Sequence, residues 1–404
     1  MKLIKKIRTD GLCKTCRDIY EYQIDECIIR VLKVILRNKP LKNIIVIESH
    51  NDFDCNGGAF YDFLIENEYN KKYKIVWLLK HPDKKPEKLP PNVECVSLFK
   101  PSIKKDYYNV IAKYFTSDNY NLKKQRPEQK FYFFSHGCGG LKNVKGKMII
   151  QDDFDYILFQ SEKYAPIQAE QYSLKYPSDR IVYLGYPAHD VMYKSDRNEI
   201  NKVVSKKYDK VIIWMPTFRR GGGTGRNDSL IEQPLGIPLL RKKDQYLFLN
   251  NYLKKRNSFL IIKLHPMQDL TNLKIRSMSN ISVLTGEKVK QKHIDNYRLL
   301  PCTDAMLSDY SGIAYEYLQL DKPIAYVLDD MNEYKLGFVT EDIDSLLAGE
   351  KIFSFEDFLG FIDDVVNEDD KYKVKREQIR DYIYKYHDGK SCERIAKFMG
   401  LKKS

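Results

Sequence analysis

Apolar residues recur along this 404-residue chain with two spacings, and each spacing predicts a different element. Short, unbroken apolar runs predict strands covered on both faces, whereas apolar residues three and four positions apart predict amphipathic helices. The predicted strands are 43–49, 73–79, 93–99, 130–136, 156–161, 179–185, 210–217, 258–266, 281–286, 305–309 and 323–329. The predicted helices are 58–69, 103–114, 163–175, 244–256, 293–299, 311–319 and a helical tail over about 355–400.

Strands alternate with helices over most of the chain, and this order is typical of parallel sheets with helical crossovers. We therefore predict an α/β protein with two Rossmann-like, doubly wound domains facing across a cleft, and helical segments at both ends. The predicted units are a helical segment at 1–40, a first domain at 41–195, a second at 196–380 and a C-terminal helix at 381–404. In such an arrangement a ligand binds between the domains, at the C-terminal ends of the strands.

The N-terminal segment is basic and amphipathic. In IDECIIRVLKVILRNKP (24–40), Ile28, Leu32 and Ile35 follow helical spacing with cationic side chains around them. Lysine plus arginine exceed aspartate plus glutamate by 13 over the whole chain, which favours an anionic partner. Such a helix could lie on an anionic membrane surface or pack on the body of the protein, and the sequence leaves both possibilities open.

The sequence contains no obvious export or membrane-spanning signal. No window approaches the roughly 20 apolar residues of a membrane span, and charges interrupt the N-terminus before a signal-peptide core develops. We therefore expect a cytoplasmic protein with reduced thiols. Cys13 and Cys16 form a lone CxxC, for which ordinary helix positions are a better explanation than a metal site.

One candidate site follows the predicted strand that ends at position 136. In SHGCGGLK, His136 and Lys142 flank three glycines, which would let a ligand approach the backbone closely. His136 is the side chain in this stretch that exchanges a proton near neutral pH. A glycine-rich turn with an incidental histidine is the alternative interpretation.

Two further candidates follow strands of the second series. PTFRRGGGTGR (216–226) sets Arg219, Arg220 and Arg226 beside four glycines, which suits either phosphate contacts or a solvated loop. IIKLHP places Lys263 and His265 at another strand end. A lone histidine in such a position is more often structural than catalytic, and a second histidine on the facing domain would change that.

A fourth candidate lies in AMLSDYSG, where Asp309 ends a strand and Ser311 and Gly312 precede a helix. We expect Ser311 to cap this helix, because serine is a favoured N-cap residue. The first amides of the helix would then form an anion site. A capped helix without a ligand is the alternative.

Taken in order, these segments resemble the CDP-glycerol glycerophosphotransferase family, the teichoic acid primases and polymerases. The family pattern is approximately H-G-T-P-L-K, G-Y-P-R-x-D, P-T-[WF]-R, K-x-H-P, D-Y-S-S-x-x-[FY]-D and D-G-x-x-x-x-R-I. This chain has His136-Gly137…Leu141-Lys142, Gly185-Tyr186-Pro187…Asp190, Pro216-Thr217-Phe218-Arg219, Lys263…His265-Pro266, Asp309-Tyr310-Ser311-Gly312…Tyr315-Glu316 and Asp388-Gly389…Arg394-Ile395. The order is preserved, and the resemblance covers about 45–397.

The resemblance implies a GT-B-type fold and transfer of glycerol phosphate or ribitol phosphate from a CDP-activated donor, with release of CMP. The acceptor would be a hydroxyl of a lipid-linked saccharide or polymer, in teichoic acid or capsule synthesis. The first domain would then hold the acceptor and the second the CDP-glycerol or CDP-ribitol. Apart from that donor, neither a cofactor nor a metal is implied. The protein would work at the inner face of the cell membrane, as a peripheral enzyme on an anionic surface.

The resemblance also implies roles for individual residues. His136, His265 and Arg219 would be catalytic, with His136 as general base; Ser311, Gly312, Arg219 and Lys142 would bind the donor phosphates; Asp309 and Glu316 would orient neighbours or hold the donor polyol. The chain departs from the pattern where Thr-Pro is replaced by Cys138-Gly139-Gly140, with one extra residue, and at Gly312 and Glu316. These departures leave the polyol and the polymer open.

Three other functions compete with this one. A GT-B glycosyltransferase with a nucleotide-sugar donor is the nearest alternative. A metal-dependent sugar transferase would need an acidic pair such as DFD at 52–54 or 153–155 beside the nucleotide. A nucleic-acid binder would use the positive charge, but no recognition motif is present, so we expect no nucleic-acid partner.

Overall fold

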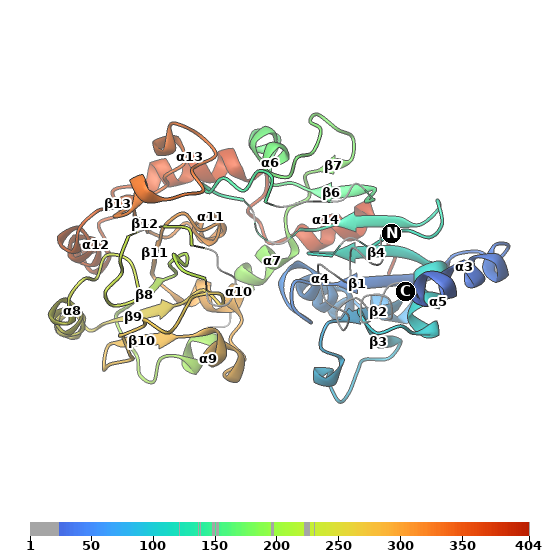
Figure 1. Cartoon of the computed structure of the whole chain (residues 1–404), viewed down its shortest axis with the longest axis horizontal. Helices are drawn as coiled ribbons and strands as arrows, with labels where there is room; N and C mark the ends of the chain where they lie inside the picture. The colour runs from blue at the N-terminus through green and yellow to red at the C-terminus, as the bar shows by residue number, and fades with distance from the viewer. Residues whose placement is uncertain are drawn as a thin grey trace, which may run out of the picture.

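The computed structural model contains two parallel sheets, each with helices on both faces, which lie side by side (Figure 1). It describes residues 24–120, 122–135, 137, 139–147, 150, 153–194, 198–221, 227–229 and 231–403. The predictions for residues 1–23, including Cys13 and Cys16, and those for His136, Cys138 and Arg226, fall outside the described residues.

The first half is a seven-stranded parallel sheet with the order β3-β2-β1-β4-β5-β6-β7. Apolar strands dominate because both faces are covered. The strands are β1 (Lys42–Glu48), β2 (Lys74–Leu79), β3 (Val93–Ser97), β4 (Ala112–Ser117), β5 (Lys130–Phe133), β6 (Tyr156–Leu158) and β7 (Ile181–Val182). The helices are α4 (Cys55–Glu66), α5 (Ile103–Ile111), α6 (Ala165–Gln171) and α7 (Pro187–Tyr193).

The second half is a six-stranded parallel sheet with the order β10-β9-β8-β11-β12-β13. Its strand order reverses direction between β8 and β11, the position at which doubly wound sheets bind ligands. The strands are β8 (Lys210–Trp214), β9 (Ser258–Lys263), β10 (Ile281–Leu284), β11 (Ala305–Ser308), β12 (Ile324–Val327) and β13 (Glu350–Ile352). The helices are α8 (Lys243–Lys255), α9 (Gly286–Gln291), α10 (Asn296–Leu299), α11 (Ile313–Tyr317), α12 (Phe355–Asn367) and α13 (Lys373–Ile383).

The chain returns to the first half at its C-terminal end. Helix α14 (Ser391–Phe398), red in Figure 1, lies among the blue and green elements of the first sheet. Cys392, Ile395 and Ala396 of this helix are buried in the same core as β1 and α4. Asp190 of α7 accepts the amide hydrogens of Ser391 at 2.8 Å and of Cys392 at 2.7 Å, which fixes where α14 begins.

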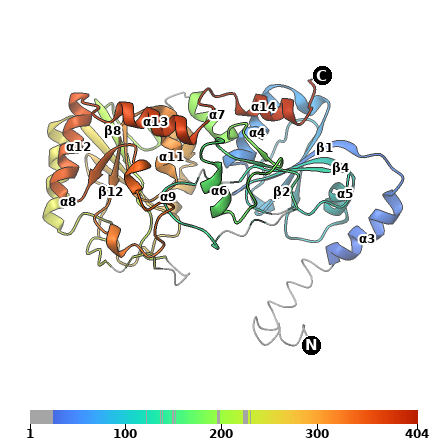
Figure 2. The same ribbon diagram turned by 90° about the horizontal axis from the view of Figure 1, so that it is seen from above.

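Helix α3 (Ile24–Leu36) stands at the far end of the first half, away from the second (Figure 2). One face packs on α5, where Lys105 pairs with Asp25. Among the residues that the structure describes, no helix is long and apolar enough to cross a membrane.

The predicted fold class is confirmed, but some elements were missed. The predicted helix at 103–114 ends at Ile111, and strand β4 begins at once with Ala112. Tyr114 and Phe115 continue the apolar pattern of the helix, and no glycine or proline separates the two elements, so the pattern hid the change. Strand β13 and helix α9 were also missed, and the helical tail is broken into α12, α13 and α14.

Candidate active site

The glycine-rich loop after β5 packs against the start of α11, so the first and fourth candidate segments meet across the two halves. Lys142 forms an antiparallel bridge with Phe338 of the second half. The Asn143 amide donates to the Gly337 carbonyl at 3.1 Å, and the Val339 amide donates to the Leu141 carbonyl at 2.9 Å. These backbone contacts hold residues 141–143 of the glycine-rich loop beside the second half.

This contact explains on steric grounds why residue 312 is a glycine. A Cβ atom at Gly312 would lie 2.6 Å from the carbonyl oxygen of Gly139, closer than any side chain tolerates. A Cβ at Gly140, whose φ is +149°, would lie 3.0 Å from the ring of Tyr315. The departures from the family pattern at Gly139, Gly140 and Gly312 are therefore complementary, because the Gly139 carbonyl occupies the space that a side chain at 312 would need.

The residues on either side of His136 are anchored. Ser135 is buried with φ of +63°, its carbonyl accepts from Asn56 Nδ2 at 2.8 Å, and its hydroxyl lies 3.0 Å from the Tyr172 hydroxyl. On the other side, Glu316 Oε1 lies 3.9 Å from the position that a Cβ would take at Gly137. The structure therefore places Glu316 beside Gly137, at the border between the halves.

Glu316 also approaches a buried histidine. His189 Nε2 lies 4.0 Å from Glu316 Oε2, and its ring packs edge-on against Tyr186 and Tyr384. Burial lowers the pKa of His189 to about 3, so the ring is neutral at physiological pH. The contact is therefore one between a carboxyl group and a neutral imidazole.

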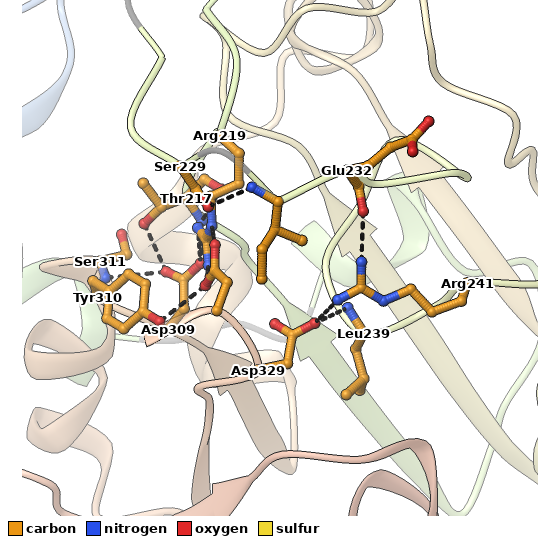
Figure 3. Close-up of polar contacts among 12 residues, drawn as sticks. Thr217, Arg219, Ser229, Glu232, Leu239, Arg241, Asp309, Tyr310, Ser311 and Asp329 are labelled. Atoms are coloured by element: carbon orange, nitrogen blue, oxygen red, sulfur yellow. Dashed lines mark hydrogen bonds and ion pairs between the residues drawn. The ribbon is translucent and has the colours of Figure 1, made fainter. Parts of the chain in front are cut away.

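Arg219 is the centre of a buried polar cluster at the point where the strand order reverses (Figure 3). Its Nε and Nη2 donate to the two oxygens of Asp330 at 2.6 and 2.9 Å. Its Nη1 donates to Asp309 Oδ2 at 2.7 Å and to the Thr217 carbonyl at 2.9 Å. Every nitrogen of the guanidinium thus donates to a protein acceptor, and the side chain has almost no exposed surface for a phosphate.

Charge balance explains the stability of this cluster. Burial opposes ionisation of Asp330, but the hydrogen bonds and positive charge of Arg219 outweigh it and lower the pKa of this carboxyl. The Tyr310 hydroxyl donates to Asp330 Oδ1 at 2.9 Å, and the Tyr310 ring lies 5.0 Å from the guanidinium carbon. The cluster is a closed, fully paired unit.

Asp309 connects this cluster to the loop that precedes α11. Its carboxylate accepts from the Thr217 amide at 2.8 Å, the Thr217 hydroxyl at 2.6 Å and the Ser311 amide at 3.2 Å. Helix α11 begins at Ile313 with Gly312 in the N-cap position, and no side chain caps it. The expectation that Ser311 is the N-cap is therefore wrong: Asp309 organises this turn, and Ser311 and Gly312 are half-buried before the helix.

The end of β9 places His265 against the loop after β8. The rings of His265 and Phe218 are 4.9 Å apart, and the Met267 amide donates to His265 Nδ1 at 3.1 Å. Because Nδ1 accepts a hydrogen bond, a neutral ring carries its proton on Nε2 and presents a donor there. Lys263, two residues earlier, is buried, and burial lowers the pKa of its ammonium group to about 8.

The acidic pairs that a metal-dependent transferase would need are engaged by backbone amides and, at Asp155, by the ammonium group of Lys124. Asp52 accepts the amide hydrogens of Lys80 and His81, and Asp54 accepts that of Asn51. Asp155 of the second pair accepts from the Phe131 amide. Within the described ranges, no group of three or more His, Cys, Asp or Glu side chains could hold a metal ion. Metal independence stays a prediction.

Sequence reasoning missed Asp330 and gave Lys263 no role. Asp330 lies three residues beyond the end of β12, on the same sheet edge as Asp309 and Thr217. The rule that side chains after parallel strands gather at one edge could have identified it. Its neighbour Asp329 would still have been ambiguous, since that carboxylate turns away to Arg241 and the Leu239 amide (Figure 3).

Comparison with known proteins agrees with this architecture. A teichoic acid glycerol-phosphate primase of Bacillus subtilis is 23% identical over 389 residues, covering 89% of this chain and 92% of that protein. The teichoic acid ribitol-phosphate polymerase TarK of Staphylococcus aureus is 27% identical over 300 residues, covering 67% of this chain. The match covers 52% of TarK, so the chain spans about half of that relative's length.

A solved structure of the wall teichoic acid polymerase TagF superposes with a TM-score of 0.69 at 18% identity, covering 99% of this chain and 95% of that one. This likeness shows a shared GT-B-like fold. The family model for CDP-glycerol:poly(glycerophosphate) glycerophosphotransferases matches residues 31–400. The chain therefore belongs to the CDP-glycerol:poly(glycerophosphate) glycerophosphotransferase family.

Proposed function

We propose that this protein transfers glycerol phosphate or ribitol phosphate from a CDP-activated donor to a hydroxyl of a lipid-linked saccharide or polymer, and releases CMP. The observation that carries the proposal is the contact between the His136 loop and the 309–316 segment, in a chain whose family membership covers 31–400. It supports a site where an acceptor on the first half meets a donor phosphate on the second.

In this proposal the acceptor hydroxyl attacks the β-phosphorus of the donor, the bond from that phosphorus to the bridging oxygen breaks, and CMP leaves. His136 takes the hydroxyl proton, a contribution of roughly 10²–10⁴-fold. Most of the remaining rate enhancement would come from positioning and charge stabilisation, as in other phosphoryl transfers. His265 would donate a hydrogen bond from Nε2 to a donor phosphate.

The geometry around Arg219 favours a different role for this residue from the catalytic and phosphate-binding one that the sequence suggested. We assign Arg219 and Asp309 as positioning residues, because both are buried and bonded to each other and to Thr217. Through the Ser311 amide they fix the turn that holds Ser311 and Gly312 toward the donor. Lys142, bridged to Phe338, and Glu316, beside Gly137, line the border of the two halves where the transfer would occur.

A donor screen tests the proposal. We expect CMP from CDP-glycerol or CDP-ribitol in the presence of a lipid-linked acceptor, and none of the corresponding nucleotide from nucleotide-sugars. Mass spectrometry of the product would give the polyol and the number of units added. Turnover of a nucleotide-sugar with neither CDP-polyol active would replace the proposal by the glycosyltransferase alternative.

Helix α3 supports the membrane part of the proposal. Val31, Val34 and Ile35 are each more than half exposed, on the side of the helix that does not pack on α5. Exposed apolar residues with Lys33 and Arg37 nearby suit an anionic bilayer surface. In sedimentation with anionic vesicles, Val34→Asp together with Ile35→Asp should reduce binding strongly, and unchanged binding would exclude α3 as the contact.

A further inference from the structure

Four cationic side chains are buried in the part of the chain that the structure describes, and three of them are paired. Lys105 meets Asp25 and two carbonyl groups, and Arg376 meets Asp321 and Asp370. Arg219 has the two carboxylates described above. Lys263 is 6% exposed, yet its ammonium has no hydrogen bond or ion pair with any described residue.

The register of the second sheet fixes where Lys263 lies. It pairs with Leu284 of β10, and the next strand on its other side continues past Trp214 to Met215. Ser308 of β11 follows in the same row, with its hydroxyl 3.3 Å from the Met215 carbonyl. Lys263 lies at the C-terminal edge of the sheet, and the other charged residue of this row is Lys351, on the far edge strand β13.

The side chain of Lys263 emerges on the face where α11 begins. Leu260, Ile262 and Leu264 alternate onto the opposite face, which packs on α8 and α12. Phe259 and Ile261 share the face of Lys263, and their core also holds Tyr310, Ala314 and Tyr315 of the α11 segment. The Lys263 side chain therefore lies at the same edge of the sheet, and on the same face, as Tyr310 and the first residues of α11.

An ammonium that has lost most of its contact with water without gaining a counter-charge destabilises the protein. The other three buried cations show that this chain normally supplies one. Removing the cost by a ligand needs an anion that reaches the end of β9, between His265 and the β8–β11 edge. A diphosphate has the required negative charge, and it would be desolvated together with the lysine.

We propose that Lys263 is the buried counter-cation of the diphosphate in the CDP-activated donor. The inference rests on the proposed function for the identity of the ligand, but the burial of Lys263 without a carboxylate partner among the described residues is a property of the fold alone. Lys263 and His265 then have different roles, because the lysine neutralises charge while the histidine donates a directed hydrogen bond.

Titration calorimetry with CDP, the part shared by both candidate donors, tests this inference. Lys263→Met should weaken CDP binding about 10- to 100-fold, the usual loss for a hydrogen bond to a charged group. Lys263→Arg should keep part of the affinity. The matched control is Lys254→Met on the exposed side of α8, which should leave binding unchanged.

A second readout separates charge pairing from simple damage. At pH 8 the free ammonium is partly deprotonated, and a bound diphosphate should restore its proton. Binding by the wild type should then take up protons, seen as a heat that varies with buffer ionisation enthalpy, and Lys263→Met should take up fewer. Equal affinity in wild type and Lys263→Met, or equal proton uptake, overturns the inference.

The same binding experiment distinguishes failure of the proposed function from failure of the inference about Lys263. If the wild type does not bind CDP at all, the donor assignment is contradicted, and inorganic pyrophosphate becomes the probe for Lys263. Pyrophosphate binding that depends on Lys263 would keep the anion site without the nucleotide, whereas binding independent of Lys263 would exclude that site.

Discussion

Arg219 and Lys263 are both buried cations at the C-terminal edge of the second sheet, Arg219 in the loop after β8 and Lys263 at the end of the adjacent β9, yet their surroundings are opposite. Arg219 has two carboxylates and a carbonyl within hydrogen-bond distance. Lys263 has no protein counter-charge among the described residues. The difference is consistent with a positioning role for Arg219 and with the proposed role of Lys263 as the counter-cation of a bound diphosphate.

The two cations also show that an arginine in a glycine-rich loop need not be a phosphate ligand. An arginine after a strand suggests phosphate binding, but this one is buried and bonded to Asp309 and Asp330, so almost none of its surface is open to a phosphate. A buried charge is a better guide to a ligand when the protein has left its pairing incomplete.

The largest expected effect comes from breaking the closed cluster. Arg219→Met should lower the free energy of unfolding by about 3–5 kcal/mol, because two buried carboxylates lose their counter-charge. Denaturant unfolding followed by circular dichroism measures it. The matched control is Tyr310→Phe, which removes one donor to Asp330 and should cost about 1 kcal/mol. Similar stability of Arg219→Met and wild type would contradict the positioning role.

Lys263→Met should change the free energy of unfolding in the opposite direction from Arg219→Met. Its folded-state pKa of about 8 lies below the unfolded value of about 10.4. The unfolded chain therefore binds more protons between these values, so the stability of the wild type rises with pH across this window. Lys263→Met should be at least as stable as wild type at pH 7, with the difference shrinking by about 1–3 kcal/mol toward pH 10.5. A pH-independent difference would mean that Lys263 is paired or hydrated.

Much of the architecture could be predicted from the sequence, because strands buried on both faces leave long apolar runs between helices. Strand β4 escaped because helix α5 passes into it without a turn residue. The return of Cys392 and Ile395 to the first core is a tertiary contact that local periodicity cannot indicate.

The sequence predicted which strand ends carry the site residues, but not which of these residues pair with each other and which are left to bind a ligand. The motifs identified Arg219, Asp309 and Lys263 without showing which charges pair with each other. Pairing depends on side-chain directions at a shared sheet edge, and a motif records neither direction nor burial. Gly312 likewise became interpretable when the carbonyl of Gly139 was found to occupy the space beside it.

The proposed transfer requires that a histidine of the first half activates the acceptor against a donor held by the second half. The most direct measurement is CMP release from the active CDP-polyol by wild type and His136→Ala, together with donor binding by both. We expect His136→Ala to lose roughly 10²–10⁴-fold in CMP release while binding the donor with similar affinity. CMP release at the wild-type rate by His136→Ala would show that this histidine is not the base.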